Sequence, residues 1–173
     1  MKAALTGTPG VGKSTIALLL QRKGWTVVEV GDLARREGLL LELDEVRDSY
    51  DVDLDGLDEV TCAMPGNVVL VGHLSHLLQV DLIIVLRCQP RVLAERLQVR
   101  HYAADKVAEN VEAEALDVIL VESVEGSADV CEVDTTGRTP EEVTSSVLEI
   151  LRGERRKYLP GHLDWSQEAL GWD

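Results

Sequence analysis

Residues 7–14 read Gly-Thr-Pro-Gly-Val-Gly-Lys-Ser. This stretch follows a short apolar run at residues 2–6 and precedes residues 13–23, whose apolar side chains recur at helical spacing. Glycines let the backbone wrap around a phosphate, and successive N–H groups at a helix N-terminus stabilise its negative charge. The sequence therefore predicts a phosphate-binding loop between a buried strand and a helix.

Two side chains of this loop suit a nucleotide and its metal ion. The loop fits the pattern Gly-x-x-x-x-Gly-Lys-Ser, in which Lys13 would reach the β- and γ-phosphates and Ser14 would ligate Mg²⁺. A chance glycine-rich turn is the alternative, but the motif requires a preceding strand and a following helix, and both are predicted here. We therefore expect a nucleoside triphosphate and Mg²⁺ at this loop.

The alternation of elements predicts an α/β fold. Short apolar runs predict strands at residues 2–6, 25–30, 68–71, 81–87 and 128–134. Helical periodicity and end signals predict helices at residues 13–23, 32–37, 54–64, 90–99, 105–121 and 139–151. The acidic residues before residue 54 are expected to be irregular. Strands that alternate with helices imply a five-stranded parallel sheet with helices on both faces, the architecture of P-loop NTPases.

The composition fits one globular domain. The chain has 173 residues, of which 45% are hydrophobic and 28% charged, and no apolar run approaches the ~18 residues of a membrane span. The first residues show no charged-then-apolar leader, and the three scattered cysteines fit small buried side chains in a reducing compartment. We expect a cytoplasmic protein with one domain, residues 1–173, and no membrane partner.

The charge is acidic and unevenly spread. The chain has 31 Asp and Glu against 17 Lys and Arg, a net charge of −14, and nine of the acids lie within residues 42–59. Such a surface repels a nucleic-acid backbone, so broad nucleic-acid binding is not expected. The acidic run is either a solvated face or a docking site for a basic protein partner. A basic cluster at residues 152–157 is either a solvated helix end or a contact for RNA.

The class of P-loop protein can be narrowed by motif and size. The chain has no Asn-Lys-x-Asp motif for reading guanine, and it is too short for a helicase or transporter motor. Small size and an arginine-bearing segment after the fourth predicted strand favour a kinase of nucleotides or other small molecules. In such enzymes arginines near the phosphates matter more than a general base, because positioning and charge neutralisation supply most of the catalysis.

An ordered set of motifs makes this interpretation more specific. Besides the phosphate loop, it contains Val-Gly-Asp-Leu-Ala-Arg at residues 30–35, Gly72-His73, Glu95-Arg96-Leu97, Arg100 and Tyr102. From residue 5 to about residue 151 the chain resembles the adenylate kinase isoenzyme 6 family, small nucleotide kinases also linked to small-ribosomal-subunit maturation. It is most similar to the archaeal branch, in which Gly-His-Leu-Ser-His-Leu-Leu, here residues 72–78, is typical.

The resemblance implies an organisation like that of nucleoside monophosphate kinases. A monophosphate-binding segment would occupy about residues 31–54, a short lid about residues 99–109 and a C-terminal tail residues 153–173. The ATP phosphates would bind at five residues of the loop and its helix, namely Gly10, Gly12, Lys13, Ser14 and Thr15, with Ser14 also serving Mg²⁺.

The same resemblance implies roles for three arginines. Arg35 would hold the acceptor phosphate, Arg100 would close over ATP, and Arg138 would contact the adenine end. Taken alone, Arg35 and Arg100 could equally be solvent-exposed residues of helices. With the resemblance, Lys13, Arg100 and Arg35 are the expected catalytic residues.

The chain departs from the family at the end of the third predicted strand. Val71 stands where the family usually carries an acidic residue that supports Mg²⁺, directly or through water, and valine can do neither. Losing one preorganised group of this kind can slow catalysis by about 10²–10³-fold. His76, a few residues later, is expected on a helix surface.

The implied function is reversible phosphoryl transfer from MgATP to AMP, giving two ADP, with ATP hydrolysis and a part in small-subunit rRNA maturation. Its expected partners are AMP, ADP and ATP. A nucleotide-switched ribosome-assembly factor with weak or no kinase turnover, which binds a basic small-subunit ribosomal protein, is one alternative. A kinase for another small acceptor is the other.

Overall fold

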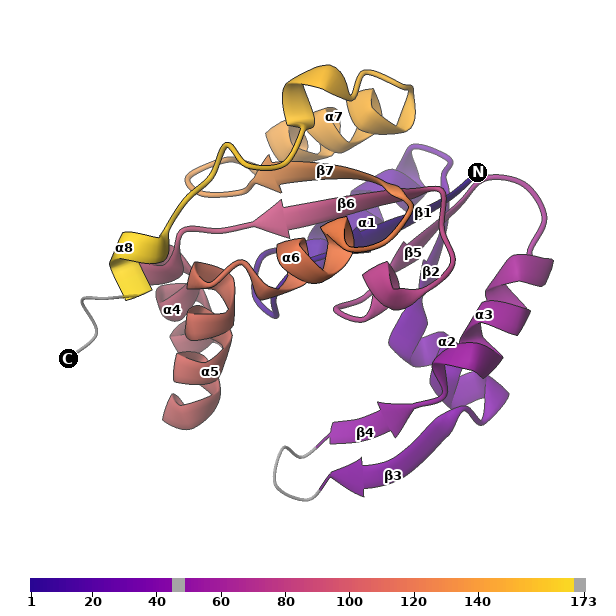
Figure 1. Cartoon of the computed structure of the whole chain (residues 1–173), viewed down its shortest axis with the longest axis horizontal. Coiled ribbons are helices and arrows are strands. Elements are labelled where there is room, and N and C mark those ends of the chain that lie inside the picture. The colour runs from indigo at the N-terminus through magenta and orange to yellow at the C-terminus, as the bar shows by residue number, and fades with distance from the viewer. Residues whose placement is uncertain (45–48, 170–173) are drawn as a thin grey trace.

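A central parallel sheet organises the molecule (Figure 1). The computed structural model describes residues 1–44 and 49–169. The strand order is β2-β5-β1-β6-β7, and all four pairings are parallel. The strands are β1 (Lys2–Thr6), β2 (Thr26–Glu29), β5 (Val68–Val71), β6 (Leu82–Arg87) and β7 (Asp129–Asp134). The predicted five-stranded α/β fold is confirmed.

Helices alternate with most strands of the sheet, whereas β5 is followed only by a short 3₁₀ helix. The α-helices are α1 (Lys13–Arg22), α2 (Val30–Glu37), α3 (Leu54–Ala63), α4 (Pro90–Val99), α5 (Ala104–Ala115), α6 (Val118–Val124), α7 (Pro140–Leu151) and α8 (Ser166–Ala169). Two short 3₁₀ helices are η1 (Ser75–Leu77) and η2 (Arg156–Tyr158). None of the helices in the described part of the chain is long and apolar enough to cross a membrane.

The sheet is largely buried on both faces, and its side chains alternate between one cluster on the α1 face and two clusters on the other face. In β1, Ala3 and Leu5 join the cluster that packs under α1 and α7, whereas Ala4 joins Leu120 of α6 on the opposite face. Because successive side chains of a strand point to opposite faces, residue parity tells which core a strand residue faces. This parity decides where polar groups at the strand ends point.

The acidic stretch before α3 contains a hairpin, where an irregular segment was predicted. Strands β3 (Leu40–Asp44) and β4 (Ser49–Val52) pair antiparallel. The prediction was wrong because the acidic composition masks the period-two alternation Leu-Glu-Leu-Asp at residues 41–44. Residues 45–48 of the acidic run lie outside the described residues.

Some acids of that run have local structural roles. Asp53 caps α3 by accepting a hydrogen bond from the Gly56 N–H at 3.0 Å, and Asp58 accepts one from the Gln79 N–H at 2.6 Å. An acid at the N-terminus of a helix stabilises the free N–H groups there. Part of the acidic run therefore serves the fold itself.

The single long helix predicted at residues 105–121 is divided into α5 and α6. The break lies at Asp117, a non-glycine residue with a φ of 57°. Arg87, at the end of β6, causes it: one guanidinium nitrogen donates to the carbonyl oxygen of Glu114 at 3.2 Å and also contacts the Asp117 carboxylate. The guanidinium thus satisfies a carbonyl at the C-terminus of α5, which an uninterrupted helix would have used.

His76 is buried rather than exposed on a helix surface, so that prediction was wrong. Its Nδ1 hydrogen-bonds with Thr6 Oγ1 at 3.1 Å and its Nε2 with Glu122 at 2.9 Å. These two partners, far away in sequence, hold η1 against β1 and α6.

The described part of the tail packs back on the sheet. The ring of Trp165 lies 4.9 Å from the guanidinium carbon of Arg87, a cation–π distance. Two members of the basic cluster form ion pairs, Arg155 with Asp129 of β7 and Lys157 with Glu149 of α7. Trp172, the other aromatic residue of the predicted tail, lies outside the described residues.

Candidate functional site

The phosphate loop joins β1 to α1 in a shape that needs glycine. Gly7 has a φ of 133°, and a Cβ there would lie 2.4 Å from the Leu86 carbonyl oxygen. Gly10 has a φ of 97°, and a Cβ there would meet Leu97 at 2.8 Å. Positive φ and close backbone approach are what glycine permits and other residues do not. The loop is therefore packed tightly against the end of β6 and against α4.

The loop presents the N-terminus of α1. Gly12 caps the helix in a left-handed conformation, and Lys13 and Ser14 are its first two residues. The Gly12 carbonyl accepts the N–H groups of Thr15 and Ile16, at 3.1 and 3.2 Å. The first N–H groups of a helix have no partner within it, so they form an anion site together with the helix dipole.

Lys13 brings a half-buried positive charge to this site. Its Nζ donates to the carbonyl oxygens of Gly7 at 2.5 Å and Thr8 at 3.1 Å. Burial lowers the pKa of Lys13 to about 8, although the nearby Glu114 and Glu29 act in the opposite direction. No carboxylate within residues 1–44 and 49–169 forms an ion pair with this ammonium, and a phosphate would supply a close anionic partner.

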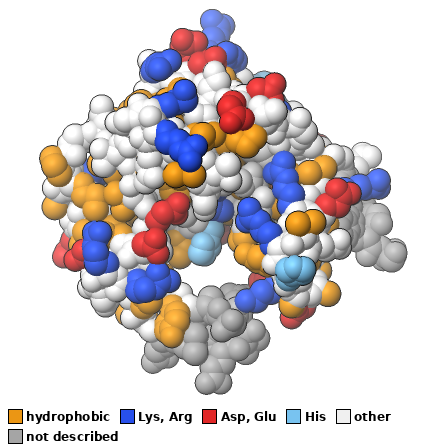
Figure 2. All heavy atoms as spheres, turned by 180° about the vertical axis from the view of Figure 1, so that it is seen from behind, with side chains coloured by type: hydrophobic (Ala, Val, Ile, Leu, Met, Phe, Trp, Pro, Cys, Tyr) orange, Lys and Arg blue, Asp and Glu red, His pale blue; other side chains and the backbone are white. Residues whose placement is uncertain are grey.

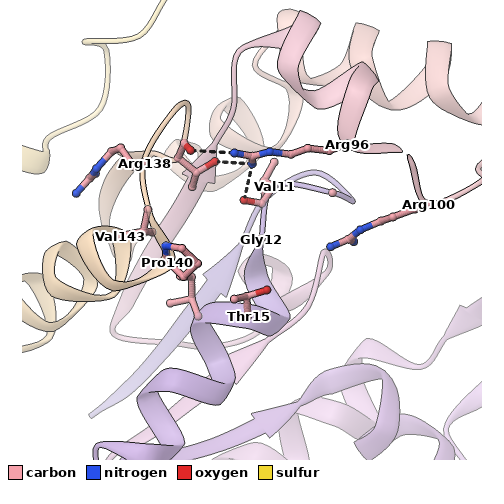
Figure 3. Close-up of a pocket in the computed structure, with 11 residues that line it drawn as sticks. Val11, Gly12, Thr15, Arg96, Arg100, Arg138, Pro140 and Val143 are labelled. Carbon is pink, nitrogen blue, oxygen red and sulfur yellow. Dashed lines mark hydrogen bonds between the residues drawn. The ribbon is translucent and has the colours of Figure 1, made fainter. Parts of the chain in front are cut away.

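A pocket of about 180 Å³ opens beside the loop, between α4 and the start of α7 (Figure 3). Gly12 and Thr15 line it together with Arg100, whose guanidinium points towards the loop. The charge of Arg100 also contributes to lowering the Lys13 pKa, so the two cations lie near one another. The structure thus brings the predicted phosphate loop and Arg100 together.

Arg100 lies in a tight connection between two helices. It is the C-terminal cap of α4, and residues 100–103 join α4 to α5 through His101, whose φ is 59°. The predicted lid, residues 99–109, therefore consists of this turn and the first half of α5.

Arg96 and Arg138 also line the pocket, but both guanidinium groups are bonded to protein atoms. Arg96 donates to the side chain and the carbonyl oxygen of Thr135, at 3.1 and 3.0 Å. Arg138 donates to the Asp134 carbonyl at 3.0 Å and to Ser146 at 2.8 Å. Figure 3 shows the Arg138 guanidinium directed away from Val11 and Arg100. The structure places Arg138 at the rim and its charged group outside the pocket.

Arg35 lies apart from this pocket, on α2. It is 69% exposed at its side chain and pairs with Asp32 at 2.8 Å. The helix leads into the hairpin of β3 and β4. Figure 1 shows this hairpin below the sheet, to the right of α4 and α5. Figure 2 shows a hollow on the face seen from behind, with Lys and Arg side chains along one rim.

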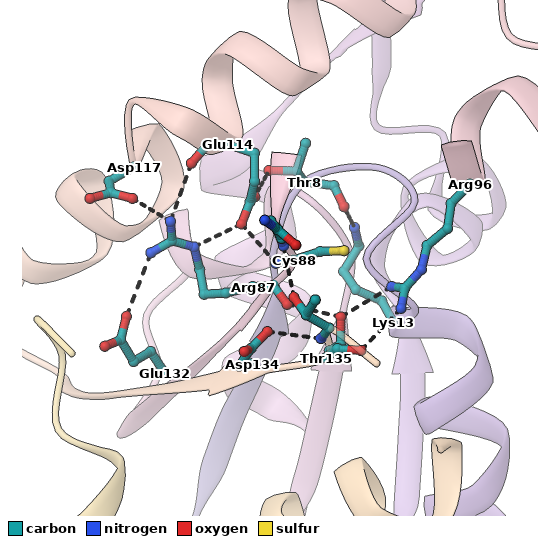
Figure 4. A network of polar contacts seen from close by, with 12 residues as sticks. Thr8, Lys13, Arg87, Cys88, Arg96, Glu114, Asp117, Glu132, Asp134 and Thr135 are labelled. Carbon is teal, nitrogen blue, oxygen red and sulfur yellow. Dashed lines mark hydrogen bonds and ion pairs between the residues drawn. The ribbon is translucent and has the colours of Figure 1, made fainter. Parts of the chain in front are cut away.

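Sequence reasoning missed a buried network behind the phosphate loop (Figure 4). Glu114 of α5, 3% exposed at its side chain, accepts hydrogen bonds from the Arg87 Nε at 2.8 Å and the Cys88 N–H at 3.0 Å. It also accepts one from the Thr8 hydroxyl. Arg87 reaches Glu132 on β7 at 3.5 Å. The sequence signals this network only through Arg87, the charged residue that ends the apolar run Leu-Ile-Ile-Val-Leu-Arg at residues 82–87.

The polar groups at the loop suit a metal ion that arrives with a nucleotide. In residues 1–44 and 49–169, no group of three or more His, Cys, Asp or Glu could hold a metal by itself. Mg²⁺ often takes one or two protein oxygens and fills the rest of its shell with waters and substrate phosphates. The exposed Ser14 fits that pattern, whereas Val71 is 0% exposed within an apolar cluster.

Solved structures and a family model agree with this fold. A family model described as AAA domain matches residues 4–117. Crystal structures of shikimate kinase from Aquifex aeolicus and Bacteroides thetaiotaomicron superpose with TM-scores of 0.56 and 0.55 at 18% and 15% identity. The two matches cover 89% and 88% of this chain and 98% of each kinase. At this identity the similarity concerns the fold alone.

Archaeal proteins are much more similar in sequence. A protein from Thermococcus kodakarensis, named "Putative adenylate kinase", is 46% identical over 96% of this chain and 94% of its own length. Proteins of the same name from Archaeoglobus fulgidus and Methanocaldococcus jannaschii are 44% and 40% identical. These matches cover 97% and 99% of this chain, and 93% and 97% of the relatives. Because the identity extends over nearly the whole of each chain, this protein belongs to the same family as these archaeal proteins.

Proposed function

We propose that this protein is an adenylate kinase that transfers a phosphoryl group from MgATP to AMP and forms two ADP. The observation that carries the proposal is the pairing of the Lys13 loop with Arg100 at one pocket. The names of the archaeal relatives support ATP and AMP as the substrates. A pocket beside the loop, bordered by Pro140 and Val143, offers an apolar wall for the adenine of ATP.

The described residues suit this reaction because it needs positioning and charge neutralisation. The loop N–H groups and Lys13 would hold the phosphates of ATP, and Arg100 would lie on the opposite side of the transferred group. Mg²⁺, when bound with ATP through Ser14, would neutralise charge on the phosphates. The attacking oxygen belongs to the phosphate of AMP and is already ionised, so no protein base is required.

Arg35 is the proposed contact for the phosphate of AMP, within the segment of residues 31–54. We expect Arg35→Ala to raise the KM for AMP about tenfold, because a hydrogen bond to a charged group contributes about 1.5–3 kcal/mol. The kcat should change little, since Arg35 is proposed to hold the phosphate of AMP rather than the transferred phosphoryl group. Arg36→Ala is the matched control, since Arg36 is the next residue, is similarly exposed and pairs with Glu37. Steady-state kinetics with varied AMP give both values, and an unchanged KM would exclude Arg35 from the acceptor site.

Arg100 is the proposed lid residue, so its removal should act on kcat. We expect Arg100→Ala to lower kcat about 10²-fold, the effect of losing one preorganised positive group at the reacting phosphate. Arg91→Ala is the control, because Arg91 is exposed at the other end of α4. A kcat within threefold of the wild type would show that this arginine does not contact the transferred phosphoryl group.

The acceptor is tested directly with a panel of nucleoside monophosphates. Purified protein is incubated with MgATP and AMP, CMP, UMP or GMP, and each diphosphate is measured by chromatography. The proposal predicts the highest kcat/KM with AMP. A clear preference for another monophosphate would correct the acceptor, and no transfer to any of them would overturn the kinase assignment.

The other expectations from the composition and from the family resemblance stay predictions. They are ATP hydrolysis, a cytoplasmic location, a part in small-subunit rRNA maturation and a basic ribosomal protein as partner. Co-purification with such a protein, abolished by charge reversal within residues 44–58, is the experiment for the last two.

A further inference from the structure

A carboxylate lies directly beside the valine at the end of β5. Strands β2 and β5 pair in parallel, and the register places Glu29 opposite Val71. Val71 is in turn opposite Leu5 of β1, the strand that leads into the phosphate loop. Neighbouring strands of a sheet are about 4.8 Å apart, so the backbone of Glu29 lies about that far from the backbone of residue 71.

The side chain of Glu29 is on the same face of the sheet as the phosphate loop helix. Val71 belongs to the cluster beneath α1, and Val27, two residues before Glu29, packs against the same cluster. Val28 packs instead against the cluster of α2 and α3 on the other face. By the alternation of a strand, Glu29 therefore points to the α1 side, where Lys13 and Ser14 begin the helix.

The carboxylate of Glu29 has no bonding partner in the part of the chain that the structure describes. Glu29 is half-buried, and among residues 1–44 and 49–169 its carboxylate makes no hydrogen bond or ion pair. Burial and the nearby Asp32 raise its pKa, while the positive charge of Lys13 lowers it, which agrees with a position near the loop. The other acids near this site are engaged: Asp32 pairs with Arg35, and Glu114 with Arg87.

We propose that Glu29 supplies, from β2, the carboxylate that orients the hydration shell of the nucleotide's Mg²⁺, the task for which Val71 has no oxygen. The proposal rests on the nucleotide-binding function proposed above. Oxygen donors suit Mg²⁺, which keeps several waters when it binds with phosphates. A carboxylate one strand away can accept hydrogen bonds from such waters while Ser14 offers its hydroxyl to the ion. Glu29 is thus a positioning residue.

The first test measures how strongly Mg²⁺ and ADP assist each other's binding. Titration calorimetry gives the Kd for ADP with Mg²⁺ and with EDTA, and the ratio of the two values is the coupling. We expect Glu29→Gln to reduce this coupling about tenfold, because partners of metal-bound groups typically change metal affinity 10–100-fold. In EDTA the variant should bind ADP at least as tightly as the wild type, because one negative charge near the phosphates is removed.

Two controls separate this role from a structural one. Glu125→Gln changes an exposed glutamate at the end of α6 and should leave both Kd values unchanged. Mn²⁺ binding to the protein–ADP complex, followed by electron paramagnetic resonance, should weaken in Glu29→Gln alone. If Glu29 had only a structural role, Glu29→Gln would weaken ADP binding equally with and without the metal ion.

Moving the carboxylate back to residue 71 gives a second test. In the Glu29→Gln background, Val71→Asp should restore most of the coupling, whereas in the wild type it should change the coupling less than threefold. If the buried aspartate prevents folding, seen as a lost melting transition, the result with Glu29→Gln alone decides.

The outcomes distinguish this inference from the proposed function. A wild type that binds no ADP with or without Mg²⁺ contradicts the proposed function. A wild type with strong coupling, together with a Glu29→Gln variant of equal coupling, overturns the role of Glu29 alone. Loss of coupling in Glu29→Gln with retained binding in EDTA supports both.

Discussion

Lys13→Ala should lower the kcat for ADP formation by about 10²–10³-fold, the range observed when one preorganised group is removed from an active site. The reason is the position of the ammonium, which is half-buried at the N-terminus of α1 and, within the described residues, donates to two carbonyl oxygens of the loop. At the phosphates it would act in a medium where charges are poorly screened by water.

The same variant should keep its stability. Burial lowers the Lys13 pKa to about 8, which shows that the charged form is held at a cost in the absence of a phosphate. We therefore expect the melting temperature of Lys13→Ala to be no lower than that of the wild type. We also expect that ADP does not raise the melting temperature of this variant. Lys23→Ala, at the exposed end of the same helix, is the control. Turnover within tenfold of the wild type would contradict the role of Lys13.

Glu114→Ala should destabilise the protein by about 3–5 kcal/mol, the usual cost of removing one partner from a buried ion pair. Glu114 accepts from Arg87, from the Cys88 N–H and from the Thr8 hydroxyl, so three donors lose an acceptor at once. Arg87, 2% exposed at its side chain, would keep its charge in the interior with Asp117 and Glu132 as remaining partners.

Urea unfolding measures this loss, and Glu112→Ala is the matched control. Glu112 lies two residues earlier on α5 and is exposed, so its substitution should change the free energy of unfolding by less than about 0.5 kcal/mol. Because Thr8 belongs to the phosphate loop, Glu114→Ala should also weaken ADP binding. A free energy of unfolding within 1 kcal/mol of the wild type would mean that Arg87 is satisfied by its other partners, in contradiction to this expectation.

The features that sequence predicted well are local. The phosphate loop follows from glycine spacing, and the helix at Pro140 from the capping box of Thr139 and Glu142, which the structure contains. The five strands follow from short apolar runs, which are typical of strands buried on both faces; Glu132 of β7 is a buried exception that faces Arg87.

The features that sequence missed depend on contacts between distant residues. The break between α5 and α6 comes from Arg87, which is about 30 residues away in sequence from Asp117. His76 is buried because Thr6 and Glu122 both reach it. Glu29 could not be connected with residue 71 before the pairing of β2 with β5 was known. The roles of Arg35, Arg100 and Arg138 remain predictions from the resemblance.

Transfer between two nucleotides differs from ATP hydrolysis in the stoichiometry of ADP formation. Wild-type protein is incubated with MgATP, with and without AMP, beside Lys13→Ala, and ATP, AMP, ADP and inorganic phosphate are measured together. The proposal predicts two ADP formed for each AMP consumed, no accumulation of phosphate in step with ADP, and no such reaction in Lys13→Ala. One ADP and one phosphate for each ATP, at a rate independent of AMP, would contradict it.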